Sequence, residues 1–124
     1  MNLKRVVVTG LGALTPIGNN ISEFWNGLMN GVSGAAPITY FDATNFKTQF
    51  ACEVKNFNVE DFIERKEARK MDKYTQYAMV TATEAVEDAK FNFETLNLDR
   101  AGVIWGSGIG GLQTFQDEVT NLNA

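Results

Sequence analysis

The chain contains no histidine, one cysteine and two prolines among its 124 residues. Without histidine it lacks the commonest general acid–base side chain, which excludes Ser-His-Asp and Cys-His catalysis within this chain alone. A single cysteine cannot form an intrachain disulfide, and the usual zinc sites need histidine or several cysteines. We therefore expect neither a disulfide framework nor a metal site.

Long apolar runs are also missing. No stretch approaches the roughly 20 residues that a membrane-spanning helix needs. The apolar residues near the N-terminus end at Gly10, too early for a signal peptide. We therefore expect a cytoplasmic protein with no membrane span. The net charge of −4 argues against general nucleic-acid binding, and 44% hydrophobic with 21% charged residues is a globular composition.

The hydrophobic pattern predicts alternating strands and helices. Strands are expected at residues 4–12, 50–54 and 101–105, and helices at residues 20–31, from Asp72 to Ala89 and after Gly111, with a helical turn at 59–64. Residues 32–48 are expected to be an irregular connection. The order predicts an α/β fold with a mainly parallel sheet. Because three strands make a narrow sheet, we interpret the chain as part of a larger α/β unit.

Side chains of the predicted core are concentrated in a few places. The helix from Asp72 carries a stripe of small and aromatic residues that would let it pack closely: Tyr74, Ala78, Thr81, Ala85 and Ala89. Trp25, Trp105 and most of the nine phenylalanines are also expected in the core. Cys52, within a strand-like run, is expected to be a buried, unreactive thiol.

Two glycine-rich turns follow predicted strands. Gly106-x-Gly108-x-x-Gly111 formally matches the dinucleotide-binding fingerprint, whereas Gly10-x-Gly12 has Thr15 in place of the third glycine. From the residues alone, glycines that let a strand turn tightly into a helix are favoured over a phosphate site. Phosphate binding stays open as the alternative.

The basic residues are clustered. Residues 65–73 hold five of the eleven lysines and arginines, giving this segment a charge of +3 and leaving −7 for the rest of the chain. Arg65 with Arg69, and Lys66 with Lys70, would share a helix face at a spacing of four. The pattern is compatible with a solvated helix face, which is favoured from the residues alone, and with a docking patch for an acidic partner.

Three motifs in order along the chain resemble the β-ketoacyl-[acyl-carrier-protein] synthases. They are Val6-Val7-Val8-Thr9-Gly10-Leu11-Gly12 through Thr15-Pro16-Ile17-Gly18 with Phe24-Trp25, Arg65-Lys66-Glu67 with Arg69-Lys70-Met71-Asp72, and Gly106-Ser107-Gly108-Ile109-Gly110-Gly111-Leu112. The resemblance covers essentially all 124 residues. At Ile109 the sequence resembles the type II enzymes of bacterial fatty-acid synthesis more than type I, which usually carries glycine there.

The resemblance implies a thiolase-like fold, with two similar α/β halves, and a homodimer. Residues 1–124 would be the N-terminal portion of the first half. It also implies an acyltransferase of fatty acid biosynthesis. Such an enzyme takes an acyl group from its carrier protein onto a cysteine and condenses it with the carbanion formed by decarboxylating malonyl-carrier protein. No cofactor is implied beyond the phosphopantetheine that carries the substrates.

The resemblance also assigns roles to residues. The catalytic cysteine and two histidines of the family match no position here, so no catalytic residue is implied in this chain, and Cys52 falls where the family commonly has a small residue. The basic residues Lys66, Arg69 and Lys70 would form the platform for the acidic acyl carrier protein. Ile109 would lie at the end of the acyl pocket and gate chain length.

Two alternatives remain at this point. One is a nucleotide-dependent dehydrogenase, on the strength of the glycine fingerprint. The other is a chain-length-factor-like subunit of a polyketide system, which keeps the fold but lacks the catalytic cysteine.

Overall fold

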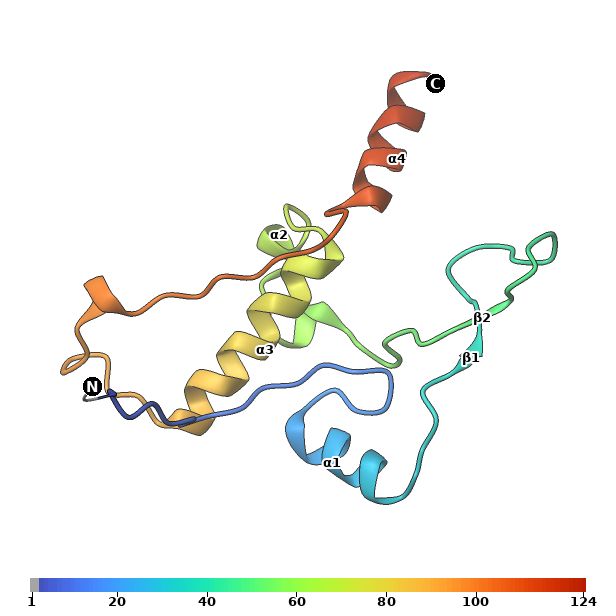
Figure 1. Ribbon diagram of the computed structural model, residues 1–124. Helices are drawn as coiled ribbons and strands as arrows, with labels where there is room; N and C mark the ends of the chain where they lie inside the picture. Colours follow the sequence, from blue (N-terminus) through green and yellow to red (C-terminus); the bar gives the residue numbers. More distant parts are fainter. Residues whose placement is uncertain (1–2) are drawn as a thin grey trace.

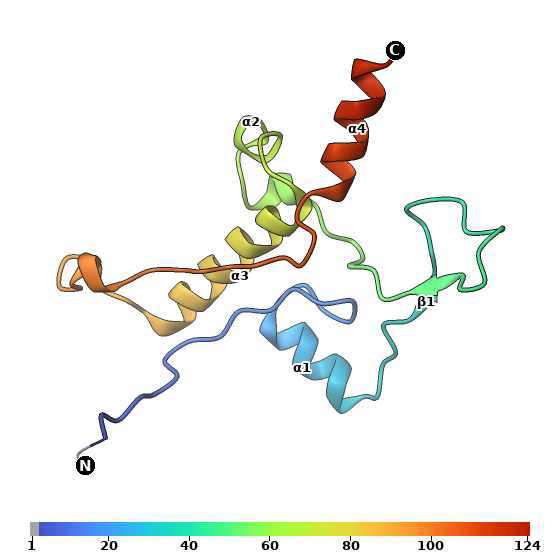
Figure 2. The same cartoon turned by 45° about the horizontal axis from the view of Figure 1, so that its top comes forward.

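The computed structural model describes residues 3–124 as helices joined by long extended segments, with very little sheet (Figure 1). Within these residues there are four α-helices: α1 (Ile21–Met29), α2 (Arg65–Ala68), α3 (Lys73–Ala89) and α4 (Leu112–Leu122). Two 3-10 helices, η1 (Val59–Asp61) and η2 (Leu98–Arg100), and two short strands, β1 (Ala36–Pro37) and β2 (Phe50–Ala51), complete the order. Helix α3 lies at the centre of the molecule in both views (Figures 1 and 2).

Helix α1 confirms the prediction for residues 20–31 and shows how its ends are set. The side chain of Asn20 accepts a hydrogen bond from the backbone N–H of Glu23 at 2.9 Å, which satisfies a donor that the first turn would otherwise leave unpaired. Beyond the C-terminal end, Gly31 adopts φ +63° and its N–H donates to the Leu28 carbonyl. Glycine takes this left-handed conformation without steric penalty, so it ends the helix.

Helix α3 confirms the predicted long helix. Its buried residues are Ala78, Val80 and Thr81. The predicted stripe contains Ala78 and Thr81, and its small residues do permit close packing. An ideal Cβ on Gly10 would lie 2.6 Å from the Ala89 backbone nitrogen, closer than real Cβ atoms approach. The N-terminal extended segment therefore runs directly against the backbone of α3, and glycine is required at the contact.

The strand predictions for residues 4–12 and 101–105 are not realised within residues 3–124. The sheet here has two strands, in which Ala36 pairs with Ala51 and Pro37 with Phe50 in antiparallel register. Of the strand predicted at 50–54 only Phe50–Ala51 forms, and its partner lies in the segment expected to be irregular. A strand is held by hydrogen bonds to its neighbours, and within residues 3–124 neither residues 4–12 nor residues 101–105 are hydrogen-bonded to a partner strand.

Both extended segments nevertheless lie beside α3. Thr9 and Gly12 from the first, and Val103 and Trp105 from the second, line with α3 a hollow of about 310 Å³. Extended segments lying along one helix are the arrangement of a helix layer over a sheet layer. The layered α/β order is therefore visible even though the sheet is not closed.

The core predictions for the aromatic residues are wrong for residues 3–124 taken alone. Trp25 is 60% exposed and Trp105 51%, and seven of the nine phenylalanines are exposed. The buried apolar side chains in the described residues are Ala68, Ala78 and Val80. The exposed positions include the predicted strands, where Val6 is 90% and Ile104 fully exposed. An apolar surface this large marks contact with further polypeptide.

None of the helices in residues 3–124 is both long and apolar enough to cross a membrane.

Candidate functional site

The basic segment (Arg65–Lys73) joins α2 to α3 and forms the most strongly positive part of the chain. Lys66, Arg69 and Lys70 are all exposed, whereas Ala68 between them is 4% exposed and packs inward. Lys70 donates to Glu67 at 2.6 Å, and Arg65 pairs with Glu60 at 3.2 Å. Within residues 3–124 neither Lys66 nor Arg69 forms an ion pair. These two cations are therefore the ones most available to an acidic partner.

The basic segment does not present the shared helix face that the spacing of four predicted for Arg65 with Arg69 and Lys66 with Lys70. Helix α2 ends at Ala68, Arg69 is its C-cap, and Lys70 lies in the turn that follows. The turn is tightened by three-residue hydrogen bonds from the N–H groups of Lys70 and Met71. Gln76 of α3 reinforces it, because its side-chain amide donates to the carbonyls of Ala68 and Met71 at 2.9 and 3.1 Å. The basic side chains thus project from a fixed turn rather than from one helix face.

Lys73, the last cation of the segment, is held differently. Its ammonium lies 4.0 Å from the centre of the Tyr40 ring, a cation–π contact. Burial, followed by hydrogen bonding to Tyr40, raises the pKa of Tyr77, so that phenol stays neutral. The contact between Lys73 and Tyr40 connects the start of α3 to the loop before β2. Lys73 is therefore less available to an external partner than Lys66 or Arg69.

The glycine-rich loop (Gly106–Gly111) carries Ile109 into solvent. Ile109 is 79% exposed, and no atom lies within 4 Å of where a Cβ on Gly106 or Gly108 would be. Gly110 adopts φ +77°, a conformation that needs glycine, and its N–H donates to the Ser107 hydroxyl at 3.2 Å. Ile109 is therefore the one bulky side chain on a tight turn, and within residues 3–124 nothing packs around it as in a core.

The two glycine motifs have separate structural explanations. Gly10 and Gly12 allow the N-terminal segment to approach α3, and a Cβ on Gly12 would lie 3.0 Å from the Ala85 nitrogen. Gly111 lies against the carboxylate of Asp72, which occupies the space that a Cβ would need. An aspartate at the end of a glycine loop repels phosphate. The loop therefore does not have the electrostatics of a phosphate cradle.

Cys52 is exposed, so the prediction of a buried thiol is wrong. It follows Ala51, the last residue of the two-residue strand β2, and the short ladder does not cover its side chain. Within residues 3–124 no group of three His, Cys, Asp or Glu side chains is placed to hold a metal ion. Cys52 thus has neither a metal nor a histidine that would turn it into a catalytic centre.

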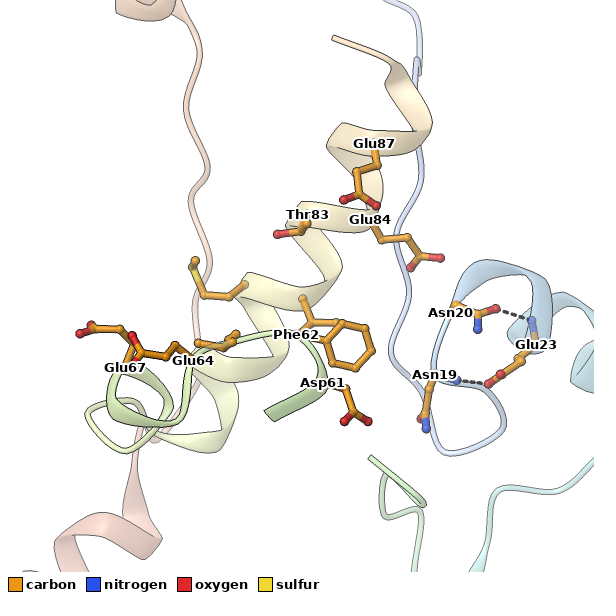
Figure 3. A pocket seen from close by; sticks show the side chains of 13 residues that line it. Asn19, Asn20, Glu23, Asp61, Phe62, Glu64, Glu67, Thr83, Glu84 and Glu87 are labelled. Carbon is orange, nitrogen blue, oxygen red and sulfur yellow. Dashed lines mark hydrogen bonds between the residues drawn. The ribbon is translucent and has the colours of Figure 1, made fainter. Parts of the chain in front are cut away.

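A hollow of about 660 Å³ lies between α3, the start of α1 and the segment from η1 to α2 (Figure 3). Six of its lining residues carry carboxylates: Glu23, Asp61, Glu64, Glu67, Glu84 and Glu87. Several of these carboxylates are already used within the chain. Glu23 accepts from the Asn19 N–H at 2.8 Å, and Asp61 accepts from the Asn58 amide at 2.8 Å.

Glu84 joins two segments at the edge of this hollow through its carboxylate. One of its carboxylate oxygens accepts from the Ala13 N–H and the other from the Ile21 N–H, both at 2.8 Å. It therefore fixes the loop before α1, and the first residue of α1, onto α3. Sequence reasoning gave no signal for Glu84, since its partners lie 71 and 63 positions away. We therefore interpret the hollow as a contact region between α3 and the start of α1 rather than as a catalytic site.

Comparison with known proteins identifies the class. The family model of the beta-ketoacyl synthase N-terminal domain matches residues 3–124. The chain is 49% identical over 119 residues to 3-oxoacyl-[acyl-carrier-protein] synthase 2 of Synechocystis, covering 96% of this chain and 29% of that protein. To the protein of the same name from Staphylococcus aureus it is 51% identical over 113 residues, covering 91% and 27%.

A solved structure shows the same fold. It is a type II polyketide synthase acyl carrier protein in complex with its ketosynthase bound to the hexaketide. This chain matches it with a TM-score of 0.75 at 26% identity, over 98% of this chain and 31% of that one. The chain belongs to the beta-ketoacyl synthase family and has the N-terminal part of its α/β, thiolase-like fold. Family membership removes the dehydrogenase alternative. The chain spans less than a third of the length of the curated relatives it matches.

Replacing Glu84 with alanine in the complete protein is expected to lower the free energy of unfolding by about 2 kcal/mol, because two backbone donors lose a charged acceptor. Glu84→Gln should lose roughly half of that, since an amide offers only one acceptor oxygen to two donors. Chemical denaturation measures both. Glu87→Ala is the matched control: Glu87 is exposed on the same helix, and its carboxylate accepts no hydrogen bond from residues 3–124. Equal losses for Glu84→Ala and Glu87→Ala would contradict the assignment.

Proposed function

We propose that this chain is the N-terminal part of a 3-oxoacyl-[acyl-carrier-protein] synthase of type II fatty acid biosynthesis. The complete protein elongates acyl chains by decarboxylative condensation of an acyl-enzyme with malonyl-carrier protein. The single observation that supports this most strongly is about 50% identity to two curated proteins of that name over more than nine-tenths of the chain. A chain-length-factor-like subunit is less well supported, because both of these relatives are named as synthases.

The chemistry divides between this chain and the rest of the protein. Condensation needs an activated cysteine thiolate and groups that stabilise developing negative charge. This chain has no histidine, and Cys52 lies beside a short strand rather than at a helix N-terminus. We therefore assign no catalytic residue here and place the reacting groups in the remainder of the protein. No cofactor is needed beyond the phosphopantetheine on which the substrates arrive.

Two parts of this chain would act on the substrates. The basic segment would receive the acidic acyl carrier protein through Lys66, Arg69 and Lys70, and its exposure and net charge of +3 support that role. The ketosynthase in the similar structure is itself seen with an acyl carrier protein. Ile109 would stand at the end of the acyl pocket and limit chain length. The exposed apolar surface would be covered by the rest of the protein and by a second subunit of a cytoplasmic homodimer.

The test is elongation of an acyl-carrier primer with malonyl-carrier protein. We expect the complete protein to form the 3-oxoacyl product and residues 1–124 alone to form none. Cys52→Ala in the complete protein should leave turnover nearly unchanged, which separates Cys52 from the catalytic cysteine. A hundredfold loss in that variant, about 2.7 kcal/mol in activation free energy, would overturn the assignment of Cys52 as non-catalytic. No product from the complete protein would overturn the proposed function.

A further inference from the structure

The side chain of Asp72 does not cap the helix that it precedes. Asp72 is the N-cap residue of α3, yet its carboxylate makes no capping hydrogen bond there. It accepts a hydrogen bond from the hydroxyl of Thr114 in the first turn of α4, 42 positions further along the chain. An aspartate that gives up the usual local cap for a distant partner joins two elements instead of ending one.

Helix α4 depends on this contact at its N-terminus. Its own N-cap is Gly111, which offers no side chain, and its first turn contains no acidic residue. The Asp72 carboxylate therefore supplies from outside the negative charge that a helix N-terminus favours. In residues 3–124, the Asp72–Thr114 contact is the only hydrogen bond from α4 to another element. Figure 2 shows α4 leading away from the rest of the molecule at this point.

Asp72 also explains one glycine of the loop. A Cβ on Gly111 would overlap the Asp72 carboxylate, whereas Gly106 and Gly108 have nothing within 4 Å of that position. The loop is thus held at its C-terminal end, by Asp72, and free at its centre. Ile109 lies two residues before this fixed point and is followed by the left-handed Gly110. The position of Asp72 consequently sets where Ile109 can lie.

We propose that Asp72 is a positioning residue for chain-length selection: its carboxylate bonds Thr114, lies against Gly111 and so holds Ile109 in the acyl path. The inference rests on the proposed function, because it gives Ile109 the gating role argued above. It adds a physical link between the basic segment, which contains Asp72, and the loop. Asp72 acts through Ile109 and touches no substrate.

The test measures the ratio of elongation rates for long and short acyl primers in the complete protein. The primers are small thioesters, so docking of the carrier protein does not affect the comparison between long and short primers. Asp72→Ala and Thr114→Val are each expected to change the ratio at least about threefold, in the same direction, and the double variant should add little to either. Asp72→Asn keeps an acceptor oxygen and should retain most of the wild-type ratio. Asp117→Ala is the control, since the carboxylate of Asp117 bonds only the Gln113 side chain within α4.

The outcomes separate this inference from the proposed function. An altered ratio in Ile109→Phe with unchanged ratios in Asp72→Ala and Thr114→Val would overturn the role of Asp72 and leave the gate standing. Unchanged ratios in all three variants would overturn the gate itself. Equal losses for every primer, with lowered melting temperatures, would show that the contact serves only stability and would also overturn the proposal. Additive effects of the Asp72 and Thr114 changes would show that the two do not act together.

Discussion

Ile109→Phe in the complete protein is expected to abolish use of long acyl primers while short primers remain usable. Ile109 is the one bulky side chain between Gly108 and Gly110, and it is 79% exposed in this part of the chain. If it stands at the end of the acyl pocket, its added volume displaces the terminal methylenes of the substrate. Each excluded methylene forfeits about 0.8 kcal/mol of burial, so two correspond to roughly fifteenfold in rate, and steric strain adds to that.

The measurement is the acyl-chain-length profile of wild type, Ile109→Phe and Ile109→Ala side by side. The alanine variant removes volume at the same place and should keep long primers usable, which makes it the matched control for any general disturbance of the loop. The competing explanation is that Ile109 fills a gap in the core. A uniform fall across all chain lengths, with a lower melting temperature in both variants, would favour that explanation and contradict the gate.

The helices were predictable because their signals are local. Asn20, the apolar spacing after it and Gly31 delimit α1, and the pattern from Asp72 to Ala89 gives α3. Start and stop signals of this kind act within one or two turns, so they do not depend on the rest of the protein. The motifs that suggested the family were also local, and the family match confirms them.

The strands were not recovered, for a reason that lies in their physics. The segments around Val6 and Ile104 have the apolar, β-branched composition of buried strands. Both residues are nevertheless exposed and lie outside any strand in residues 3–124. A strand needs its neighbours for hydrogen bonds and its two faces covered for burial. The chain spans less than a third of its curated relatives, so we expect those neighbours in the remaining length.

The residues of the candidate site could be predicted from the sequence, but the contacts that position them could not. The sequence showed the cations and Ile109, but not that α2 ends at Ala68, because Gln76 fixes that turn from the next helix. The sequence also did not predict that Asp72 lies against Gly111. The two residues are far apart in the chain, and neither the basic segment nor the glycine-rich loop carries a pattern that indicates this contact. A long-range contact made by a single polar side chain produces no periodic pattern in the sequence, so it cannot be predicted from periodicity. The contacts of Gln76 and Asp72 are of this kind, and they position the candidate site.

Reversing the charge of Lys66, Arg69 and Lys70 together is expected to reduce kcat/KM for carrier-protein substrates by at least about thirtyfold at low salt, roughly 2 kcal/mol. The three side chains are exposed, and replacing them with glutamate would set like charges against an acidic carrier. Exposed charges are screened over about 8 to 10 Å at physiological ionic strength, so the gap between wild type and variant should narrow as salt rises. Small thioester substrates, which bring no carrier surface, should be affected far less.

The ion pairs in the structure predict which single charge reversals reduce kcat/KM most. Lys66→Glu and Arg69→Glu should each cost more than Lys70→Glu, because Glu67 already partly neutralises Lys70 through their 2.6 Å contact, whereas Lys66 and Arg69 have no ion-pair partner within residues 3–124. Lys47→Glu supplies the matched control, an exposed lysine in the loop before β2, away from the basic segment. Equal losses on carrier and thioester substrates would assign these residues to the fold or the pocket. A loss in Lys47→Glu as large as in Arg69→Glu would point to the overall charge of the protein rather than to a docking surface.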